Sequence, residues 1–450
     1  MVSPTSNCLL QQTCNFESRK LWKIEKLDVS ISVVRGLLNL HKLWIISCQS
    51  MEEVITKEEQ QGKEIMCNEP LFPRLEDLYL KDLPKLGHFI LTKHAIVFPF
   101  LKEVDIRDCP EMKTFVQQGS VSTPSLEIVN DDDELKVVDL NKAMFNSKIS
   151  CPGLEKLFIN GAHSITALCS HQLPTAYFRK LEKLEVDSCE KLRNLMSPLV
   201  ARGVLNLRVL GIKHCQSMEQ VITEEEQQGE EIMNNELLFP LLEELELQNL
   251  PKLWHFFLTM RALEFPFLKK VKIDGCLERK TFVQQGAVSL ESVNINDEVE
   301  VVDLNKEKQK MFNSKVSSPS LEVLYIITSN SITSPYSHQL PCYFGKLVAL
   351  TVSKCGNWRN LMSPSVARGV LKLREVKIKN CPLMEEVITA EEEEGEDEMS
   401  NESLFPLLEK LCLYELSKLG HFFRTKRALE FPFLGEVEIG KCPEMKTFVQ

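Results

Sequence analysis

The chain has 450 residues, of which 43% are hydrophobic and 26% are charged, with 18 Gly and 21 Pro. This balance excludes a disordered, collagen-like or disulfide-scaffold protein and allows a large buried core. The 15 cysteines are an ordinary density for this length, so we expect reduced thiols. No apolar run approaches the ~20 residues of a membrane helix, and no secretion signal opens the chain, which predicts a cytoplasmic protein without a membrane span.

The formal net charge of −11 is concentrated in three short segments. Segments 56–71, 223–238 and 389–404 carry −2, −6 and −8, which leaves about +5 for the rest of the chain. They are Gly-centred and lack apolar periodicity, which predicts acidic loops on the convex side or the edge of the fold. No cluster of Lys and Arg has the size that phosphate binding needs, so we expect no nucleic-acid partner.

A long block repeats along the chain. Residues 51–56 return as 218–223 and as 384–389, at offsets of 167 and 166. Between 202–223 and 368–389, 14 of 22 positions are identical. The chain is therefore a duplicated array in which a block of about 167 residues is present roughly 2.7 times.

A shorter unit, Leu-x-x-Leu-x-Leu followed by Cys or Asn, repeats inside each block. In the second block it starts at Leu181, Leu207, Leu242, Leu268, Leu290 and Leu321. Apart from two long units, the spacing is the leucine-rich-repeat period of about 20–29 residues. In Leu-x-Leu both leucines point to one side of a strand and the residue between them points to the other. The pattern predicts an α/β solenoid, a curved horseshoe of about 16 repeats with one long parallel β-sheet on its concave face.

The repeats predict the domain organisation. Residues 21–450 form one leucine-rich-repeat domain, and residues 1–20 are expected to be a poorly ordered N-terminal segment. The long units are those that carry the acidic segments, so the acidic loops are insertions between repeats.

One motif resembles a known family. Phe-Pro-x-Leu-Glu-x-Leu-x-Leu-x-x-Leu-Pro-Lys-Leu stands at Phe72–Leu86 and Phe239–Leu253, each preceded by a Met-Glu-x-Val-Ile segment. It resembles the leucine-rich-repeat region of plant coiled-coil nucleotide-binding disease-resistance proteins, over residues 21–450. The resemblance implies a protein-binding module of an innate immune receptor in plant defence, which recognises a pathogen effector or a host protein altered by one. In the family the repeats also restrain the nucleotide-binding domain, and that domain's P-loop is absent from this chain, so we expect no ATP binding and no cofactor.

Two other functions stay open at this stage. The repeats could form an adaptor that docks a substrate for another complex, such as a ubiquitin ligase, although residues 1–20 show no F-box-like segment. The chain could also be a non-functional receptor fragment, because the unit near Leu21 is short and the sequence stops at Gln450, partway through a repeated segment.

Aromatic residues are the candidate protein-binding positions. Residues between two inward leucines face the concave surface, and there we place Trp44, Tyr79, Phe158, Tyr325 and Tyr414. Large aromatics held on rigid strands are enriched at interface hot spots. We expect a compact partner to use the N-terminal or the C-terminal aromatics, and to gain more affinity from them than from the acidic loops. The alternative is that the rings pack against neighbours on the same sheet.

Charged residues are the second candidate group on the concave face. Arg107, Lys270 and Lys272 are predicted contacts for a protein partner, and Lys377 and Lys379 share their face. Glutamates on neighbouring units carry the opposite sign: Glu244, Glu246, Glu436 and Glu438. Ion pairs between adjacent strands are therefore the alternative to partner binding.

No metal site or active site is predicted. His88, His255 and His421 recur with the long block, six strands apart, so about 29 Å separates them and they cannot share a metal. We expect structural roles on the convex side. No nucleophile motif occurs, and the carboxylates of the acidic loops are solvated, so we predict no catalytic residue and no enzyme activity.

Overall fold

The computed structural model describes the backbone of 10–13, 21–24, 29–30, 39–56, 72–92, 95–117, 126–131, 134–139, 143–169, 173, 177–223, 238–258, 263–276, 283–284, 310–312, 316–328, 334–336, 344–389, 404–423 and 431–448. The chain divides into two compact units, Met1–Met218 and Glu219–Gln450. The acidic segments predicted as loops lie outside the described residues except at their ends. Their first residues are described: Thr56 is the last residue of a short strand, and Thr223 and Thr389 each directly follow one. These three short strands belong to other sheets than the main one.

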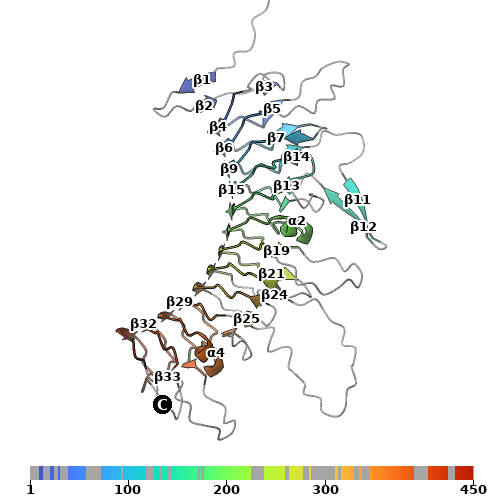
Figure 1. Ribbon diagram of the computed structural model, residues 1–450. Coiled ribbons are helices and arrows are strands. Elements are labelled where there is room, and N and C mark those ends of the chain that lie inside the picture. Colours follow the sequence, from blue (N-terminus) through green and yellow to red (C-terminus); the bar gives the residue numbers. More distant parts are fainter. Residues whose placement is uncertain are drawn as a thin grey trace, which may run out of the picture. The chain divides into compact units, whose positions relative to one another are not determined.

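The first unit is built on a sheet whose strands follow chain order (Figure 1). They are β1 (Leu10–Thr13), β2 (Leu21–Ile24), β4 (Lys42–Ile46), β6 (Asp77–Lys81), β9 (Glu103–Arg107), β15 (Lys156–Asn160), β17 (Lys183–Asp187) and β18 (Val209–Lys213). Strand β1 is antiparallel to β2, and each later neighbour pair is parallel.

The second unit repeats the plan with parallel strands only. They are β20 (Glu244–Gln248), β23 (Lys270–Asp274), β27 (Val323–Ile327), β29 (Ala349–Ser353), β30 (Glu375–Lys379), β32 (Lys410–Tyr414) and β34 (Glu436–Gly440). The unit predicted to start at Leu290 lies outside the described residues. In the described part of the second unit, β23 pairs directly with β27.

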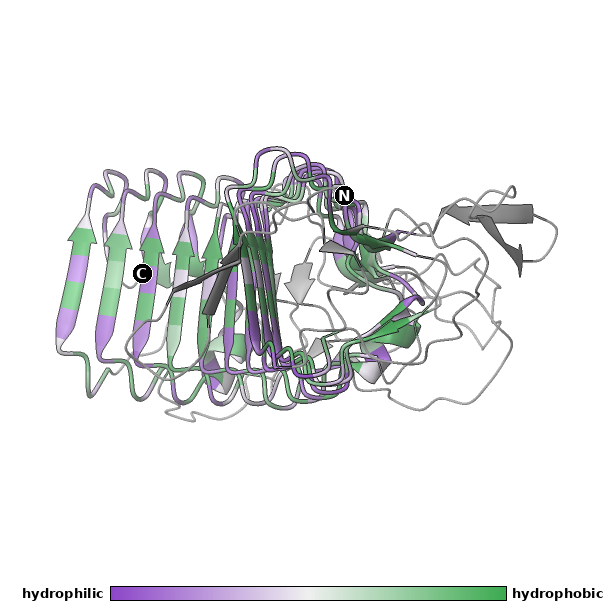
Figure 2. Ribbon diagram, turned by 90° about the horizontal axis from the view of Figure 1, so that it is seen from above, coloured by the Kyte–Doolittle hydropathy of each residue, from purple (hydrophilic) through white to green (hydrophobic). Residues whose placement is uncertain are grey.

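Alternation along these strands separates a core side from a solvent side. Most described main-sheet strands show buried second and fourth residues between partly exposed ones. Bands of opposite hydropathy accordingly alternate along the arrows (Figure 2). The inward residues named by the repeat pattern are at most 1% exposed: Leu184, Val186, Leu210, Ile212, Leu245 and Leu247. The predicted parallel leucine-rich-repeat architecture is confirmed.

Each main-sheet strand from β4 to β34 ends in a turn of left-handed backbone. Ser188 has a φ of 52° and Thr328 a φ of 53°. The Ser188 N–H donates to the Lys213 carbonyl at 2.9 Å, and the Thr328 N–H donates to the Ser353 carbonyl at 2.8 Å, so each turn is tied to the end of the next strand. The cysteine after the turn is buried, as at Cys189.

Short strands line the other side of each coil. In the first unit, β3 (Val29–Ser30), β5 (Glu53–Thr56), β7 (His88–Leu91) and β10 (Thr114–Gln117) form a parallel sheet. In the second, β19 (Gln220–Ile222), β21 (His255–Leu258) and β24 (Val283–Gln284) form one sheet, and β31 (Glu386–Ile388) pairs with β33 (His421–Phe423).

The remaining elements are small. Parallel pairs join β8 (Ile96–Val97) to β14 (Ile149–Ser150), β13 (Ala143–Phe145) to β16 (Ala167–Cys169), β22 (Leu263–Glu264) to β26 (Val316–Ser317) and β25 (Lys310–Phe312) to β28 (Ser334–Tyr336), while β11 (Leu126–Asp131) and β12 (Glu134–Asp139) are antiparallel. Two helices, α2 (Pro198–Gly203) and α4 (Pro364–Gly369), follow capping serines at Ser197 and Ser363.

Phenylalanines fill the space between the two sides of the first unit. Phe98 packs against Phe72, Phe89 and Phe115, with ring centroids 6.0–6.4 Å apart. The same clustering returns in the second unit, where Phe256 lies between Phe239 and Phe265. This core holds the main-sheet strands rigidly in register.

Candidate functional site

The predicted concave face corresponds to the solvent side of the main sheet, here called the strand face. It consists of the side chains at the first, third and fifth positions of each main-sheet strand. Strand register places the third positions in rows. In the first unit this row reads Trp44, Tyr79, Asp105, Phe158, Glu185 and Gly211.

Two predicted aromatics touch each other at the start of the row. Trp44 on β4 and Tyr79 on β6 are register partners, and their rings meet edge to face with centroids 5.7 Å apart. Both side chains remain partly exposed. The two rings therefore pack against each other, which was the alternative to partner binding. They also keep an accessible apolar surface.

An internal ion pair follows the aromatic pair. On β9, Arg107 donates from Nε and Nη2 to the two carboxylate oxygens of Asp105, at 2.9 and 2.8 Å. The Arg107 guanidinium also lies 5.8 Å from the centre of the Tyr79 ring. The bond to Asp105 raises the pKa of Arg107, although desolvation opposes it. Asp105 is only 9% exposed, so the guanidinium offsets the charge of a nearly buried carboxylate.

Phe158 occupies the next strand beyond Asp105. The Lys183 ammonium on β17 lies 5.3 Å from the centre of the Phe158 ring and 3.0 Å from a Glu185 oxygen. Lys183 thus covers part of the ring while its charge is already paired.

The C-terminal aromatics stand apart from each other. Tyr325 on β27 is partly exposed, with Thr351 as its register partner. Tyr414 follows the inward Leu413, and the residue between the two inward leucines of β32 is Cys412. Tyr414 keeps to the strand face because it is at the fifth position. Its ring has Lys379 at 5.9 Å and Lys441 at 5.1 Å.

The charged candidates are largely paired on the face itself. Lys270 lies 3.7 Å from Glu244, and Lys272 lies 2.8 Å from Glu246, so the predicted pairing between adjacent strands is confirmed for β20 and β23. Lys377 instead pairs with Glu375 of its own strand. Glu436 pairs with Lys410, and the Cys412 thiol donates to Glu438 at 3.1 Å.

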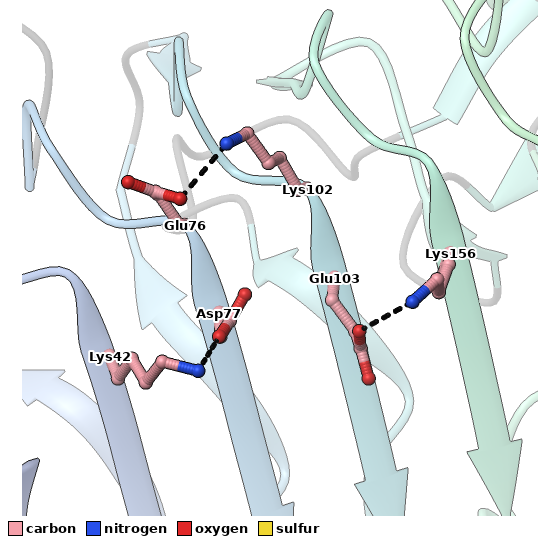
Figure 3. A network of polar contacts seen from close by, with 6 residues as sticks. All are labelled: Lys42, Glu76, Asp77, Lys102, Glu103 and Lys156. Carbon is pink, nitrogen blue, oxygen red and sulfur yellow. Dashed lines mark hydrogen bonds and ion pairs between the residues drawn. The ribbon is translucent and has the colours of Figure 1, made fainter. Parts of the chain in front are cut away.

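A second row of ion pairs crosses the strand entries of the first unit. Figure 3 shows Lys42 directed at Asp77, Lys102 at Glu76 and Lys156 at Glu103. The Lys102–Glu76 distance is 2.9 Å, and the hydrogen bond raises the pKa of Lys102. These pairs are partly or largely exposed to solvent, so salt screens their attraction.

The recurring histidines have separate, structural partners. Each lies on a short strand away from the main sheet and faces the residue 35 positions earlier: His88 with Glu53, His255 with Gln220 and His421 with Glu386. Among the described residues, no group of three or more His, Cys, Asp and Glu side chains could hold a metal ion.

The turn cysteines Cys189, Cys215, Cys355 and Cys381 are buried. The Cys189 thiol donates to the Asp187 carbonyl at 3.3 Å, and the Cys215 thiol donates to the Lys213 carbonyl at 3.2 Å. The neighbouring Cys215 thiol and burial both raise the pKa of Cys189, whereas in the second unit the neighbouring Cys355 lowers the pKa of Cys381.

Comparison with known families decides the lineage. The model of the family "Plant disease resistance protein RPS2-like, leucine-rich repeats" matches residues 7–122, 153–318 and 319–449. The chain belongs to this family. The second and third matches start at residues 153 and 319, so they are 166 residues apart, which is the length of the long block found in the sequence.

Two curated relatives from Arabidopsis thaliana carry matching names. The chain is 31% identical over 102 residues to "Probable disease resistance protein At5g47260", which covers 22% of this chain and 10% of that protein. It is 26% identical over 151 residues to "Putative disease resistance protein At4g19050", covering 33% of this chain and 11% of that protein. The chain thus spans about a tenth of each relative. In the described residues, no helix is long and apolar enough to cross a membrane.

Several residues of the strand face were not among the candidates that the sequence predicted. Asp105 holds the Arg107 guanidinium near the Tyr79 ring, and Lys183 covers part of the Phe158 ring. Lys81 lies in the fifth row beside Arg107. The Leu-x-Leu pattern already places all three on the solvent side, but their contacts depend on register with strands tens of residues away.

Proposed function

We propose that this chain is the recognition module of a plant disease-resistance protein and binds a pathogen effector, or a host protein altered by one, in the cytoplasm. Binding takes place through the strand face. The family assignment supports the disease-resistance context, and one comparison within the chain supports the surface.

The main support for the strand face as the binding surface comes from the positions at which the three copies of the long block differ. At the third strand positions of three successive coils, every copy holds a different residue. The sets are Trp44, Gly211 and Lys377; Tyr79, Glu246 and Cys412; and Asp105, Lys272 and Glu438. The inward neighbours on the same strands are almost unchanged, as Ile45, Ile212 and Ile378 illustrate.

Exposure alone does not account for this difference. Other exposed residues of the block are the same in all three copies: Glu52, Glu219 and Glu385; Lys85, Lys252 and Lys418; and Phe100, Phe267 and Phe433. Exposure by itself therefore does not make the copies differ, whereas the strand face differs at all three of these third positions. A surface whose chemistry changes while its scaffold stays constant is what recognition of different partner segments requires.

Recognition accounts better than catalysis for these side chains. Most charged groups on the strand face are neutralised by neighbours on the same or the next strand, so these groups are not held unpaired for proton transfer. The aromatics, in contrast, are rigid and partly exposed, and lose little side-chain entropy when they are covered.

The test is direct binding of the purified chain to a panel of defined pathogen effectors and the host proteins that they modify. Biolayer interferometry would compare wild type with Trp44→Ala and Tyr325→Ala. Phe100→Ala is the matched control, because it removes an aromatic that is 57% exposed away from the strand face. At least one strand-face variant should weaken a bound partner about tenfold or more while the control does not. Loss of binding in Phe100→Ala alone would contradict the proposal.

A further inference from the structure

The start of the strand face holds a group of side chains that differs from the rest of it. We call it the N-terminal cluster, and it consists of Trp44, Ile46, Tyr79, Lys81 and Arg107 on β4, β6 and β9. We propose that it binds an extended polypeptide segment in which an apolar side chain and a carboxylate are two residues apart. This deepens the proposed function, since it names the partner chemistry of the same surface.

The apolar half of the cluster is formed by the two touching rings. Trp44 and Tyr79 are held on adjacent parallel strands, and Ile46 continues the surface along β4. All three side chains are partly exposed. An apolar side chain placed over them removes ring surface from water without ordering either ring first.

The charged half of the cluster has an uncompensated cation. Lys81 lies between Ile46 and Arg107 in the fifth row of the face. Charged residues on the same three strands already form ion pairs: Lys42 pairs with Asp77, and Glu103 pairs with Lys156. In the described part of the chain, Lys81 has no carboxylate partner. Arg107 uses Nε and Nη2 on Asp105, and the charge of Asp108 also acts on it. Lys81 has no such paired carboxylate among the described residues, so it is the cation of the cluster that a partner's carboxylate would pair with.

The spacing within the cluster fits an extended segment. Tyr79 and Lys81 are two residues apart on β6, so their side chains leave the face about 6.6 Å from each other. Alternate side chains of an extended peptide have the same separation. A segment lying along β6 in either direction therefore places an apolar side chain on the rings and a carboxylate on Lys81.

The other copies of the block do not have this combination. The positions of Trp44, Tyr79 and Lys81 are occupied in the later copies by Gly211, Glu246 and Gln248, and by Lys377, Cys412 and Tyr414. Selectivity for an apolar and acidic segment should therefore be confined to the first unit.

Fluorescence polarisation with short labelled peptides tests the inference on the full chain at low ionic strength. The probe contains Glu-Ser-Phe-Ser-Glu, which offers the required pair in both directions. Lys-Ser-Phe-Ser-Lys reverses its charge, and Glu-Ser-Ala-Ser-Glu removes its ring. We expect the first peptide to bind about tenfold more tightly than either analogue.

Variants separate this cluster from the rest of the strand face. Lys81→Glu should abolish or reverse the preference for the acidic peptide, and Trp44→Ala should remove the advantage of Phe over Ala. Lys377→Glu and Tyr325→Ala are the matched changes in the second unit and should leave both preferences intact. Equal binding of the acidic and basic peptides by wild type, no binding of either, or an unchanged preference in Lys81→Glu would overturn the inference.

Failure of the peptide inference can be distinguished from failure of the proposed function. If the peptides show no preference but an effector or host protein still depends on strand-face residues, recognition stands and only this partner chemistry is wrong. If the peptides behave as expected but no partner of the panel binds, the cluster stands and the proposed class of partner is wrong.

Discussion

Arg107 spans both oxygens of the Asp105 carboxylate from two positions along the same strand, with hydrogen bonds of 2.9 and 2.8 Å. Asp105 is nearly buried in the third row between Tyr79 and Phe158, its register partners on the adjacent strands. The pair thus allows an acidic residue to stand between two aromatic positions, and it orients the guanidinium over the Tyr79 ring.

Removing one member of this pair should cost more than removing both. Arg107→Ala leaves a poorly solvated carboxylate without its partner, and we expect a loss of about 1–2 kcal/mol, because half of the arginine side chain is exposed. The double variant Asp105→Ala, Arg107→Ala should recover part of that loss. Urea unfolding of the two single variants and the double variant measures the coupling. Purely additive effects would show that the two side chains do not stabilise each other.

The Phe-Pro-Phe-Leu motif contains a buried and an exposed phenylalanine. Phe98 is fully buried among three other rings, whereas Phe100 is 57% exposed. Phe98→Ala should destabilise the first unit by about 3–5 kcal/mol, because it removes ring contacts and leaves a cavity. Phe100→Ala should change stability by less than about 0.5 kcal/mol. Urea denaturation followed by circular dichroism compares them, and similar losses for both would contradict the assigned packing.

The turn after β27 holds a β-branched residue in left-handed backbone. Thr328 has a φ of 53°, a conformation that costs an L-residue about 1–2 kcal/mol and is more readily adopted by Asn. Thr328→Asn should therefore stabilise the second unit by about 0.5–1 kcal/mol. Thr351→Asn is the control, because Thr351 lies within β29, where Asn is unfavourable. Thermal unfolding of both variants checks this, and a gain in the control or none at Thr328 would refute it.

Much of the fold was predictable because its periodicity is local. The inward residues of β17, β18 and β20 were identified from Leu-x-Leu spacing, and they are buried as expected. The same spacing predicts a unit at Leu290, which lies outside the described residues, and β23 pairs directly with β27. A short apolar pattern says that a segment can form a strand, but which strand it pairs with is decided by the whole coil.

The candidate site was less predictable for a related reason. The pattern assigned Trp44 and Tyr79 to the solvent side but not their edge-to-face contact, because their 35-residue separation is bridged only by sheet register. It also predicted that Tyr414 lies between two inward leucines, but that position is occupied by Cys412. The error arose because the run Leu-Cys-Leu-Tyr contains two outward positions. That Lys81 has no carboxylate partner among the described residues emerges only when the pairs of neighbouring strands are known.

Buried thiols should make the fold sensitive to alkali. Burial raises the pKa of Cys109 from 9.0 to about 12, so the folded state retains the thiol proton at pH values where the unfolded chain has lost it. The stabilising contribution is complete below the unfolded pKa and is lost as pH rises through it, at about 1.4 kcal/mol per pH unit for each such thiol, until the folded pKa is reached. Urea unfolding at intervals from about pH 8 to about pH 10, with reductant present, measures the slope. Lysines and tyrosines also titrate in this range, so Cys109→Ala is compared with wild type, and its slope should be shallower by about one proton. Identical slopes would show that Cys109 ionises as readily in the folded chain as in the unfolded one.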